Sequence, residues 1–377
     1  MRRMTLALLS AGVGVTLVLS ACGANQANNA GGGGGGATSG GASSGGIKVG
    51  VILPDTASSA RWEGFDKPLL EKAMKDAGLD PDIQNAQGDV QKFSTLADGM
   101  ISSGVKVLVM ASLNAASANA IATRAKARGI PTIDYDRLNL GGSAEYYVSF
   151  DNVKVGQLQG QGLADAMKDK PAGAQVIEIE GAPTDNNATL FHEGQQKVLK
   201  PLYDSGKLKL VQSQPIDDWN NQKGGTTFEQ ILTGNGGKVD GVVAANDGLA
   251  GAVITVLKKN GLNGKVPVTG QDATPEGLKA ILAGDQYMTV YKAIKLEAEA
   301  AAKLTAFLAK GDKSGADAMA KDTVKDATGN RDVKSVLAEP KLITKENVKD
   351  VVADGFVKAS EICAGALAAA CTQYGIS

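Results

Sequence analysis

Short apolar runs alternate with longer amphipathic stretches from residue 47 almost to the C-terminus. Such runs are typical of strands buried in a parallel sheet, and the longer stretches repeat apolar residues at helical spacing. The pattern predicts an α/β fold with a doubly wound sheet. Strands are expected over residues 47–53, 105–110, 130–134, 175–179, 208–212, 241–245, 266–269 and 288–291.

Helical patterns fill the stretches between these strands. Several of them end at a glycine, as at Gly78, Gly104, Gly129 and Gly261. A residue without a Cβ atom adopts the left-handed conformation of a helix C-cap at little cost, so these glycines mark helix ends. Helices are expected over residues 89–103, 115–128, 153–167, 249–260 and 293–309.

The length of the patterned region indicates two domains. The 331 residues that begin at Ile47 exceed what a single hydrophobic core usually sustains. A short apolar piece over residues 146–150 is followed by Asp151, Asn152 and a new helical pattern. No Pro-rich or Gly-rich linker separates the halves. We therefore expect two closely coupled domains with a crossover near residue 150.

The first 46 residues read as a targeting signal followed by a linker. Arg2 and Arg3 precede an uncharged apolar run over residues 4–19, which fits a signal peptide and is short for a membrane span. The run ends in Leu-Ser-Ala-Cys, which resembles the bacterial lipoprotein box and predicts cleavage after residue 21 and diacylation of Cys22. Cleavage nearby with an unmodified Cys22 is the alternative. Residues 23–46 contain only Gly, Ala, Ser, Asn, Thr and Gln, which predicts a flexible tether.

Composition excludes several classes of function. The chain has 39 Lys plus Arg against 40 Asp plus Glu, so no electrostatic case exists for binding nucleic acid. The single histidine excludes a polyhistidine metal site, and three cysteines are too few for a disulfide-rich scaffold. No cofactor and no metal are expected.

Polar side chains follow nearly every predicted strand, at the edge where open α/β sheets bind ligands. Carboxylates accept hydrogen bonds, Arg and Lys donate them and Asn does both, which suits the hydroxyls of a sugar. Trp adds a face on which a sugar ring can pack. The acids and the cations balance, which favours an uncharged ligand, although each Asp or Asn alone could be only a helix N-cap. The candidates are Arg61, Trp62, Asp136, Arg137, Asp185, Asn187, Asn246, Asp272 and Lys292.

Five segments together resemble one protein family, namely residues 147–156, 185–188, 245–247, 270–273 and 288–292. They are similar to the ribose/galactose branch of the periplasmic binding proteins of bacterial ABC importers, and within it to the D-xylose-binding members. The resemblance runs from residue 47 to about residue 358. It implies a type I periplasmic binding protein fold, in which two Rossmann-like domains joined by a three-segment hinge close on one sugar. The implied domains are 47–149 plus 291–336 and 150–290 plus 337–377.

The resemblance assigns sugar contacts to all nine candidates and adds Trp219 as an opposing aromatic wall. The chain departs from the family at His192, where the family has Arg after Leu-Phe, and at Asp218, where it has Gly. An imidazole offers one donor where a guanidinium offers a fork, so we expect His192 to contact the sugar and to alter affinity or preference. Asp218 either adds a carboxylate at the rim or faces water.

Cys363 and Cys371 lie eight residues apart, in a location that permits a disulfide. An unbroken helix between them would hold their Cα atoms about 12 Å apart, beyond bridging distance. A bond therefore requires a bend near Ala364 and Gly365, and the bonded and free states both remain open.

The leading hypothesis is a monomeric, lipid-anchored receptor outside the cytoplasm that captures D-xylose and delivers it to an ABC permease. The alternatives are another aldose, such as ribose, arabinose, glucose or galactose, and presentation of the sugar to a membrane sensor. A glycosidase that uses Asp136 and Asp272 is disfavoured, because each acid has a cation or an amide beside it. A transcriptional regulator would need a basic helix-turn-helix where this chain has a signal and glycines.

Overall fold

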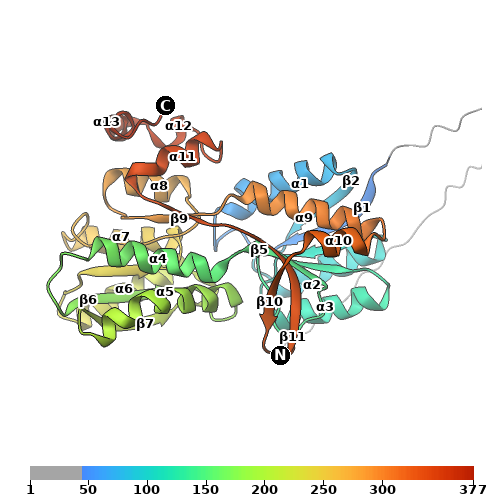
Figure 1. Cartoon of the computed structure of the whole chain (residues 1–377), viewed down its shortest axis with the longest axis horizontal. Coiled ribbons are helices and arrows are strands. Elements are labelled where there is room, and N and C mark those ends of the chain that lie inside the picture. The colour runs from blue at the N-terminus through green and yellow to red at the C-terminus, as the bar shows by residue number, and fades with distance from the viewer. Residues whose placement is uncertain (1–44) are drawn as a thin grey trace, which may run out of the picture. The chain divides into compact units, whose positions relative to one another are not determined.

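The computed structural model describes residues 45–377. The expected signal peptide, the lipidation site Cys22 and residues 23–44 of the expected tether lie outside these residues. Among residues 45–377, no helix has both the length and the apolar character needed to cross a membrane. These residues form two α/β lobes, each built on its own sheet (Figure 1).

A seven-stranded sheet is the centre of the first lobe. Its strands, in spatial order, are β10 (Asp322–Asp326), β11 (Arg331–Ala338), β5 (Tyr146–Phe150), β4 (Thr132–Tyr135), β3 (Leu108–Met110), β1 (Ile47–Leu53) and β2 (Leu79–Asn85). Neighbouring strands pair in parallel, except that β10 is antiparallel to β11. Successive side chains of a strand point to opposite faces of the sheet, so the apolar residues of β1 are divided between its two faces.

Helices cover both faces of this sheet. Val49 and Val51 pack against α1 (Lys67–Asp76) and α9 (Ile294–Ala309), whereas Ile52 packs against α2 (Val90–Ser102) and α3 (Ala115–Ala127). A further helix, α10 (Lys313–Met319), follows α9. The first lobe is thus a three-layered unit to which α9, α10, β10 and β11 return from late in the chain.

The second lobe has a three-stranded parallel sheet in the order β7 (Leu208–Pro215), β6 (Ala174–Glu180) and β8 (Gly241–Ala244). Ile177 and Ile179 pack on one face against α6 (Asn221–Gly234) and α7 (Asp247–Lys259). Val176 packs on the opposite face against α4 (Asn152–Ala166) and α5 (Asn186–Asp204). Because side chains alternate along a strand, the even-numbered residues of β6 point toward α5.

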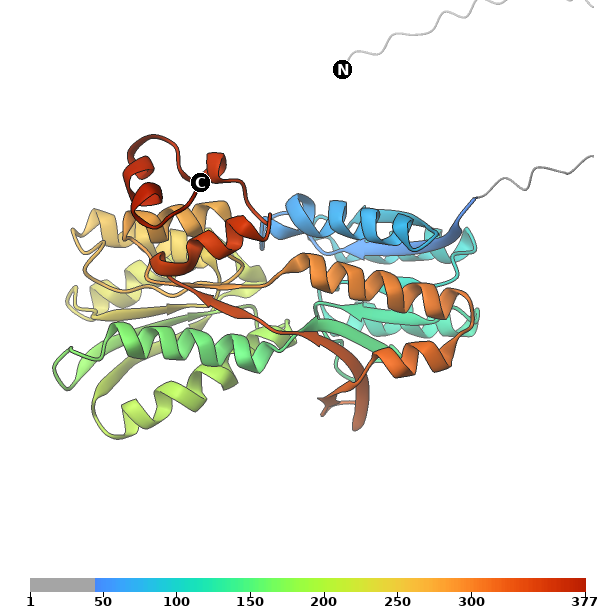
Figure 2. The ribbon, with the colours of Figure 1, turned by 45° about the horizontal axis from the view of Figure 1, so that its top comes forward.

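The chain passes between the lobes at three places (Figure 2). The first crossing joins β5 to α4, and the second joins β9 (Thr289–Tyr291) to α9. The third joins β11 to β12 (Lys341–Ile343), which pairs antiparallel with β9. Two of the three crossings therefore run beside each other through the β9 and β12 ribbon.

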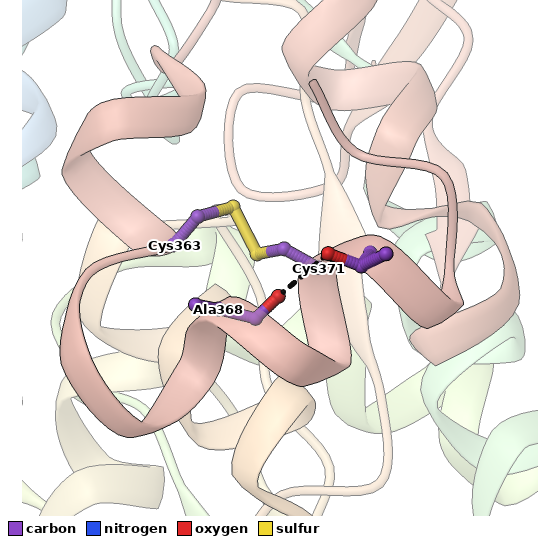
Figure 3. Close-up of a disulfide and its surroundings, with 4 residues drawn as sticks. Cys363, Ala368 and Cys371 are labelled. Atoms are coloured by element: carbon purple, nitrogen blue, oxygen red, sulfur yellow. Dashed lines mark hydrogen bonds between the residues drawn. A yellow bond between two sulfur atoms is a disulfide. The ribbon is translucent and has the colours of Figure 1, made fainter.

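The C-terminal segment packs on α8 (Pro275–Ala283) through α11 (Val348–Ala353), α12 (Ala359–Ile362) and α13 (Ala368–Gln373). Cys363 and Cys371 form a disulfide with their Cα atoms 5.7 Å apart (Figure 3). Ala364 is extended and Gly365 has a φ of +62°, so the chain turns back between the two cysteines. The bend that a disulfide requires is confirmed.

The apolar pattern located most buried elements. β1 has the expected bounds, and a helix forms in each of the five expected stretches. Residues 266–269 differ from the expectation, because they contribute only an isolated bridge between Val268 and Val242. β2, β10 and β11 were not expected. β2 is an edge strand that contains Pro81 and exposes alternate residues, and β10 is mostly exposed and charged.

Candidate functional site

A cavity lies between the two lobes, at the carboxyl ends of the parallel strands. It encloses about 300 Å³, open solvent at its mouth included. Ten of the sequence-predicted residues line it: Arg61, Trp62, Asp136, Arg137, Asp185, Asn187, Trp219, Asn246, Asp272 and Lys292. Four further residues complete the lining: Ser58, Ser59, Phe191 and Gln271.

Arg61 is the most heavily paired of these residues. It lies just before the helical turn Trp62–Asp66, and its guanidinium is 2.7 Å from Asp66 Oδ1, 2.5 Å from Asp136 Oδ2 and 2.6 Å from Glu297 Oε2. All four side chains are buried. A planar guanidinium held by three carboxyl groups cannot turn, so Arg61 fixes the orientation of Asp136 toward the cavity.

Burial and neighbouring charges shift the pKa values of Glu297 and Asp136 in opposite directions. Burial raises the pKa of Glu297 well above its ordinary value, despite the attraction of Arg61. Burial alone would also raise the pKa of Asp136, but Arg61, Lys292 and Arg137 outweigh it and hold that pKa below the usual range. Asp136 is therefore an ionised acceptor at the cavity, whereas burial favours the protonated form of Glu297 behind it.

Residues of the two lobes contact one another directly around the cavity. Ser59 Oγ donates to Asp272 Oδ2 at 2.8 Å, and Asn246 Nδ2 donates to the carbonyl oxygen of Ser58 at 3.1 Å. Lys292 Nζ lies 3.3 Å from Asp272 Oδ1 and 3.8 Å from Asp136 Oδ2. The structure is thus a closed arrangement, in which each lobe supplies partners for the other.

A second set of cross-lobe contacts surrounds the loop before α5. Asn187 Nδ2 donates to the carbonyl oxygen of Asp136 at 2.9 Å, and Arg137 Nε lies 3.0 Å from Asp185 Oδ2. Asp185 also caps α5 by accepting from the backbone N–H of Asn187 at 2.9 Å. Asp185 therefore both caps α5 and lines the cavity.

Two tryptophan faces belong to the lining, and both indoles are anchored by hydrogen bonds. Trp62 Nε1 donates to Ser58 Oγ at 3.1 Å, and Trp219 Nε1 donates to Asp185 Oδ2 at 3.1 Å. The Arg137 guanidinium carbon lies 5.3 Å from the centre of the Trp62 ring. Asp218, next to Trp219, is exposed and does not line the cavity, so its carboxylate faces water.

Some buried polar atoms of the lining retain free hydrogen-bonding capacity. Among residues 45–377, Gln271 Oε1 is buried and accepts no hydrogen bond, and the buried Asp272 Oδ1 has only the charge contact with Lys292 Nζ at 3.3 Å. A buried acceptor without a donor costs about 1–3 kcal/mol. Both atoms therefore favour a ligand that brings hydroxyl donors.

His192 lies elsewhere, contrary to the expectation that it contacts the sugar. Phe191 lines the cavity, and the next residue along α5 points in another direction, since successive helical residues are turned by about 100°. His192 Nδ1 lies 3.3 Å from Glu180 Oε1, on the side of α5 that packs on β6. The sequence missed this because helical phase cannot be read from proximity to a loop.

Two α/β lobes that close on a narrow, polar and aromatic cavity define a hinged binding protein for a small, neutral, hydrogen-bonding ligand. Comparison with known proteins agrees: a family model described as "Periplasmic binding protein domain" matches residues 49–313. The chain belongs to this family and has its type I fold of two Rossmann-like lobes joined by a three-segment hinge.

Several relatives match over most of the chain. The "D-xylose-binding periplasmic protein" of Escherichia coli K12 is 39% identical over 84% of this chain and 92% of its own length. The "Multiple sugar-binding periplasmic receptor ChvE" of Rhizobium radiobacter is 32% identical over 83% of this chain and 92% of its own. A solute binding protein of Chloroflexus aurantiacus, solved in complex with D-glucose, superposes with a TM-score of 0.76 at 29% identity, covering 83% of this chain and 97% of that one. These relatives are binding proteins of transport systems, not enzymes, as the sequence predicts.

Proposed function

We propose that the protein captures an aldopyranose sugar outside the cytoplasm, with D-xylose as its preferred ligand, and delivers it to an ABC permease. The observation that carries this proposal is the cavity lining: both lobes supply donors, acceptors and aromatic faces to one small space. Such a lining suits a molecule with hydroxyls all round its rim and C–H groups on its faces.

The charges of the lining support an uncharged ligand. Three cations, Arg61, Arg137 and Lys292, are each paired with an acid that also lines the cavity. A phosphorylated sugar would have to displace these carboxylates from their cations. A neutral sugar can instead donate to the carboxylates and accept from the cations without breaking the pairs.

The preference for D-xylose rests on the relatives. The E. coli relative, named for D-xylose, is more similar to this chain than the Chloroflexus protein, whose structure holds D-glucose. These two sugars differ by a hydroxymethyl group on the ring. We infer the pentose as the preferred ligand from the greater similarity to the relative named for it.

We infer that ligand capture works by hinge closure between domains 47–149 plus 291–336 and 150–290 plus 337–377. The open form would expose a half-site on each domain, and the sugar would favour the closed form by contacting both. The cross-lobe pair of Asn187 and Asp136 supports this, because it can form only when the lobes meet. The permease would then recognise the closed form.

The proposal includes a lipid anchor at Cys22, with residues 23–46 as a tether to the membrane, and a monomeric receptor. The sequence supports the anchor through the apolar run and the Leu-Ser-Ala-Cys segment that ends it. Mass spectrometry of the membrane fraction would test it. The expected product lacks residues 1–21 and begins with a diacylated Cys22. A soluble product that retains an unmodified Cys22 would contradict the anchor and leave the sugar site unaffected.

Calorimetric titration of the protein with a panel of aldoses tests the binding function. We expect micromolar or tighter binding of D-xylose, weaker binding of D-glucose and no binding of sugar phosphates. The variant Asp185→Asn should bind D-xylose more weakly. The control Asp218→Asn changes an exposed residue outside the cavity lining and should bind D-xylose normally. Absence of heat with every pentose and hexose would overturn the proposal.

A further inference from the structure

Three side chains of metal-ligand type meet outside the sugar cavity, between β6 and α5. They are Glu178, Glu180 and His192, and one ligand atom from each lies within 4.8 Å of the other two. His192 Nδ1 is 3.3 Å from Glu180 Oε1 and 3.9 Å from Glu178 Oε2. None of the three lines the cavity described above.

The fold brings these groups together by simple periodicity. Glu178 and Glu180 are alternate residues of β6, so both point to the face that α5 covers. His192 is on the side of α5 that faces this strand. Glu178 and Glu180 are buried, while the side chain of His192 remains 42% exposed, which leaves a route from solvent.

The surroundings orient one oxygen of each carboxylate and leave the other oxygen facing His192. Glu178 Oε1 accepts from Gln196 Nε2 at 3.0 Å and from Tyr203 Oη at 2.8 Å. Glu180 Oε2 accepts from Gln195 Nε2 at 3.3 Å. Among the described residues, Glu178 Oε2 is buried without any hydrogen-bond partner, and it is the oxygen that faces His192.

The two carboxylates of the cluster also lack a Lys or Arg partner among the described residues. Among residues 45–377, no Lys or Arg nitrogen lies within 4 Å of either carboxylate, and only His192 does. A buried pair of acids calls for a compensating positive charge.

We propose that Glu178 Oε2, Glu180 Oε1 and His192 Nδ1 bind one divalent transition-metal ion of the zinc type. Two carboxylates neutralise the ion, and one imidazole with two carboxylate oxygens suits such an ion better than Ca²⁺, which takes six to eight oxygens. Metal–ligand distances of about 2.0–2.1 Å put tetrahedral ligand atoms about 3.4 Å apart, near the spacing around His192 Nδ1. Water would fill the remaining position.

The site has neighbours that link it to the cavity wall. Gln195, which orients Glu180, also donates to Gln159 Oε1 at 2.9 Å, and Gln159 Nε2 donates to the carbonyl oxygens of Ala245 and Gly270. These carbonyls precede Asn246 by one residue and Asp272 by two. The ion would therefore stiffen the second lobe, with or without sugar, and the proposal does not rest on the sugar-binding function.

Equilibrium dialysis against Zn²⁺ and Co²⁺ tests the site, using the full chain with Cys22→Ser so that no free thiol competes. We expect one ion per chain, a rise in melting temperature with added metal, and Co²⁺ visible absorption bands typical of nitrogen and oxygen ligands. His192→Ala and Glu180→Gln should each weaken binding by about tenfold or more. Glu193→Gln, an exposed carboxylate on the same helix paired with Lys197, should bind like the parent.

A plain ion pair of a protonated His192 with Glu180 makes the opposite prediction. In that case the parent chain binds no metal ion at free metal concentrations up to about 1 mM. A dissociation constant above that value would be too weak for a specific protein metal site. That result would overturn the proposal. Binding that survives His192→Ala undiminished would overturn it as well, because the ion would then lie elsewhere.

Discussion

Asn187 of the second lobe donates to two oxygens of Asp136 in the first, at 2.9 Å to the carbonyl oxygen and 3.1 Å to Oδ1. Its own Oδ1 accepts from Asn152 Nδ2 at 2.9 Å, next to the first interlobe crossing. One side chain therefore joins the cavity, the opposite lobe and the hinge. In the proposed hinge closure, this residue would link the meeting of the lobes to ligand binding.

The variant Asn187→Ala should weaken sugar binding by about tenfold to a hundredfold, since leaving buried partners unsatisfied costs about 1–3 kcal/mol. Calorimetry with D-xylose measures the loss, and the intrinsic Trp fluorescence change on closure should need more sugar. Gln212→Ala, on the exposed part of β7, is the matched control and should bind as the parent does. Parent-like affinity in Asn187→Ala would show that closure does not depend on this contact.

Glu297 offers a prediction about pH. Its pKa is raised by burial above the ordinary value of 4.5, so the folded protein holds a proton that the unfolded chain releases. The stability that this proton contributes is complete below about pH 4.5 and is lost as pH rises through the folded pKa. Glu297→Gln mimics the protonated form and should flatten the decline in unfolding free energy between about pH 5 and 8.

Urea unfolding at a series of pH values measures this effect. The neighbouring acids Asp136 and Asp66 also raise the pKa of Glu297, so the comparison must be between variant and parent at each pH. Glu299→Gln, on the same helix and 4.0 Å from Lys295, serves as the control for a half-exposed carboxylate. An equal loss of stability at every pH in Glu297→Gln would mean that the native carboxyl is ionised.

The sequence identified the parts of the site that follow directly after buried strands. Asp136 and Asn246 could be found because β4 and β8 are fully buried short strands, and the polar side chains that follow them lie at the carboxyl edge of each sheet. Ser59 lines the cavity from a loop with no such signal, and only the tertiary arrangement places it 2.8 Å from Asp272. Glu297 was missed for the same reason, since α9 carries two acids, Glu297 and Glu299, and only packing buries the first of them.

His192 illustrates the other limit of sequence reasoning. The seventh residue of a helix can face the ligand, the sheet or solvent, and the choice depends on the axial rotation of that helix. Here Gly194 sets the rotation, because α5 lies so close to α4 that a Cβ at this residue would come 2.1 Å from the carbonyl oxygen of Val153. That close approach turns Phe191 toward the cavity and His192 toward β6.

Gly181 supports the aromatic wall of the cavity. A Cβ atom at this position would come 2.2 Å from the Trp219 ring and 2.8 Å from Ala188 Cβ, so one of these groups must shift. Gly181→Ala should therefore displace Trp219, lowering unfolding free energy by about 1–3 kcal/mol and weakening sugar binding. Gly251→Ala, at an open helical position in α7, should instead stabilise the fold by about 0.5–1 kcal/mol. Two alanine variants of equal stability would contradict this account.

The disulfide between Cys363 and Cys371 closes a loop with a sequence separation of 8 on the outer side of α8. A loop of this length contributes about 2–3 kcal/mol by restricting the unfolded chain. Replacing both cysteines by Ser should therefore increase amide hydrogen exchange over residues 359–376 first, because these residues are held mainly by α8 and by the bond itself. Sugar affinity should stay unchanged, since neither cysteine lines the cavity. A loss of affinity on reduction would instead mean that the C-terminal segment transmits its stability through α8 to Asp272.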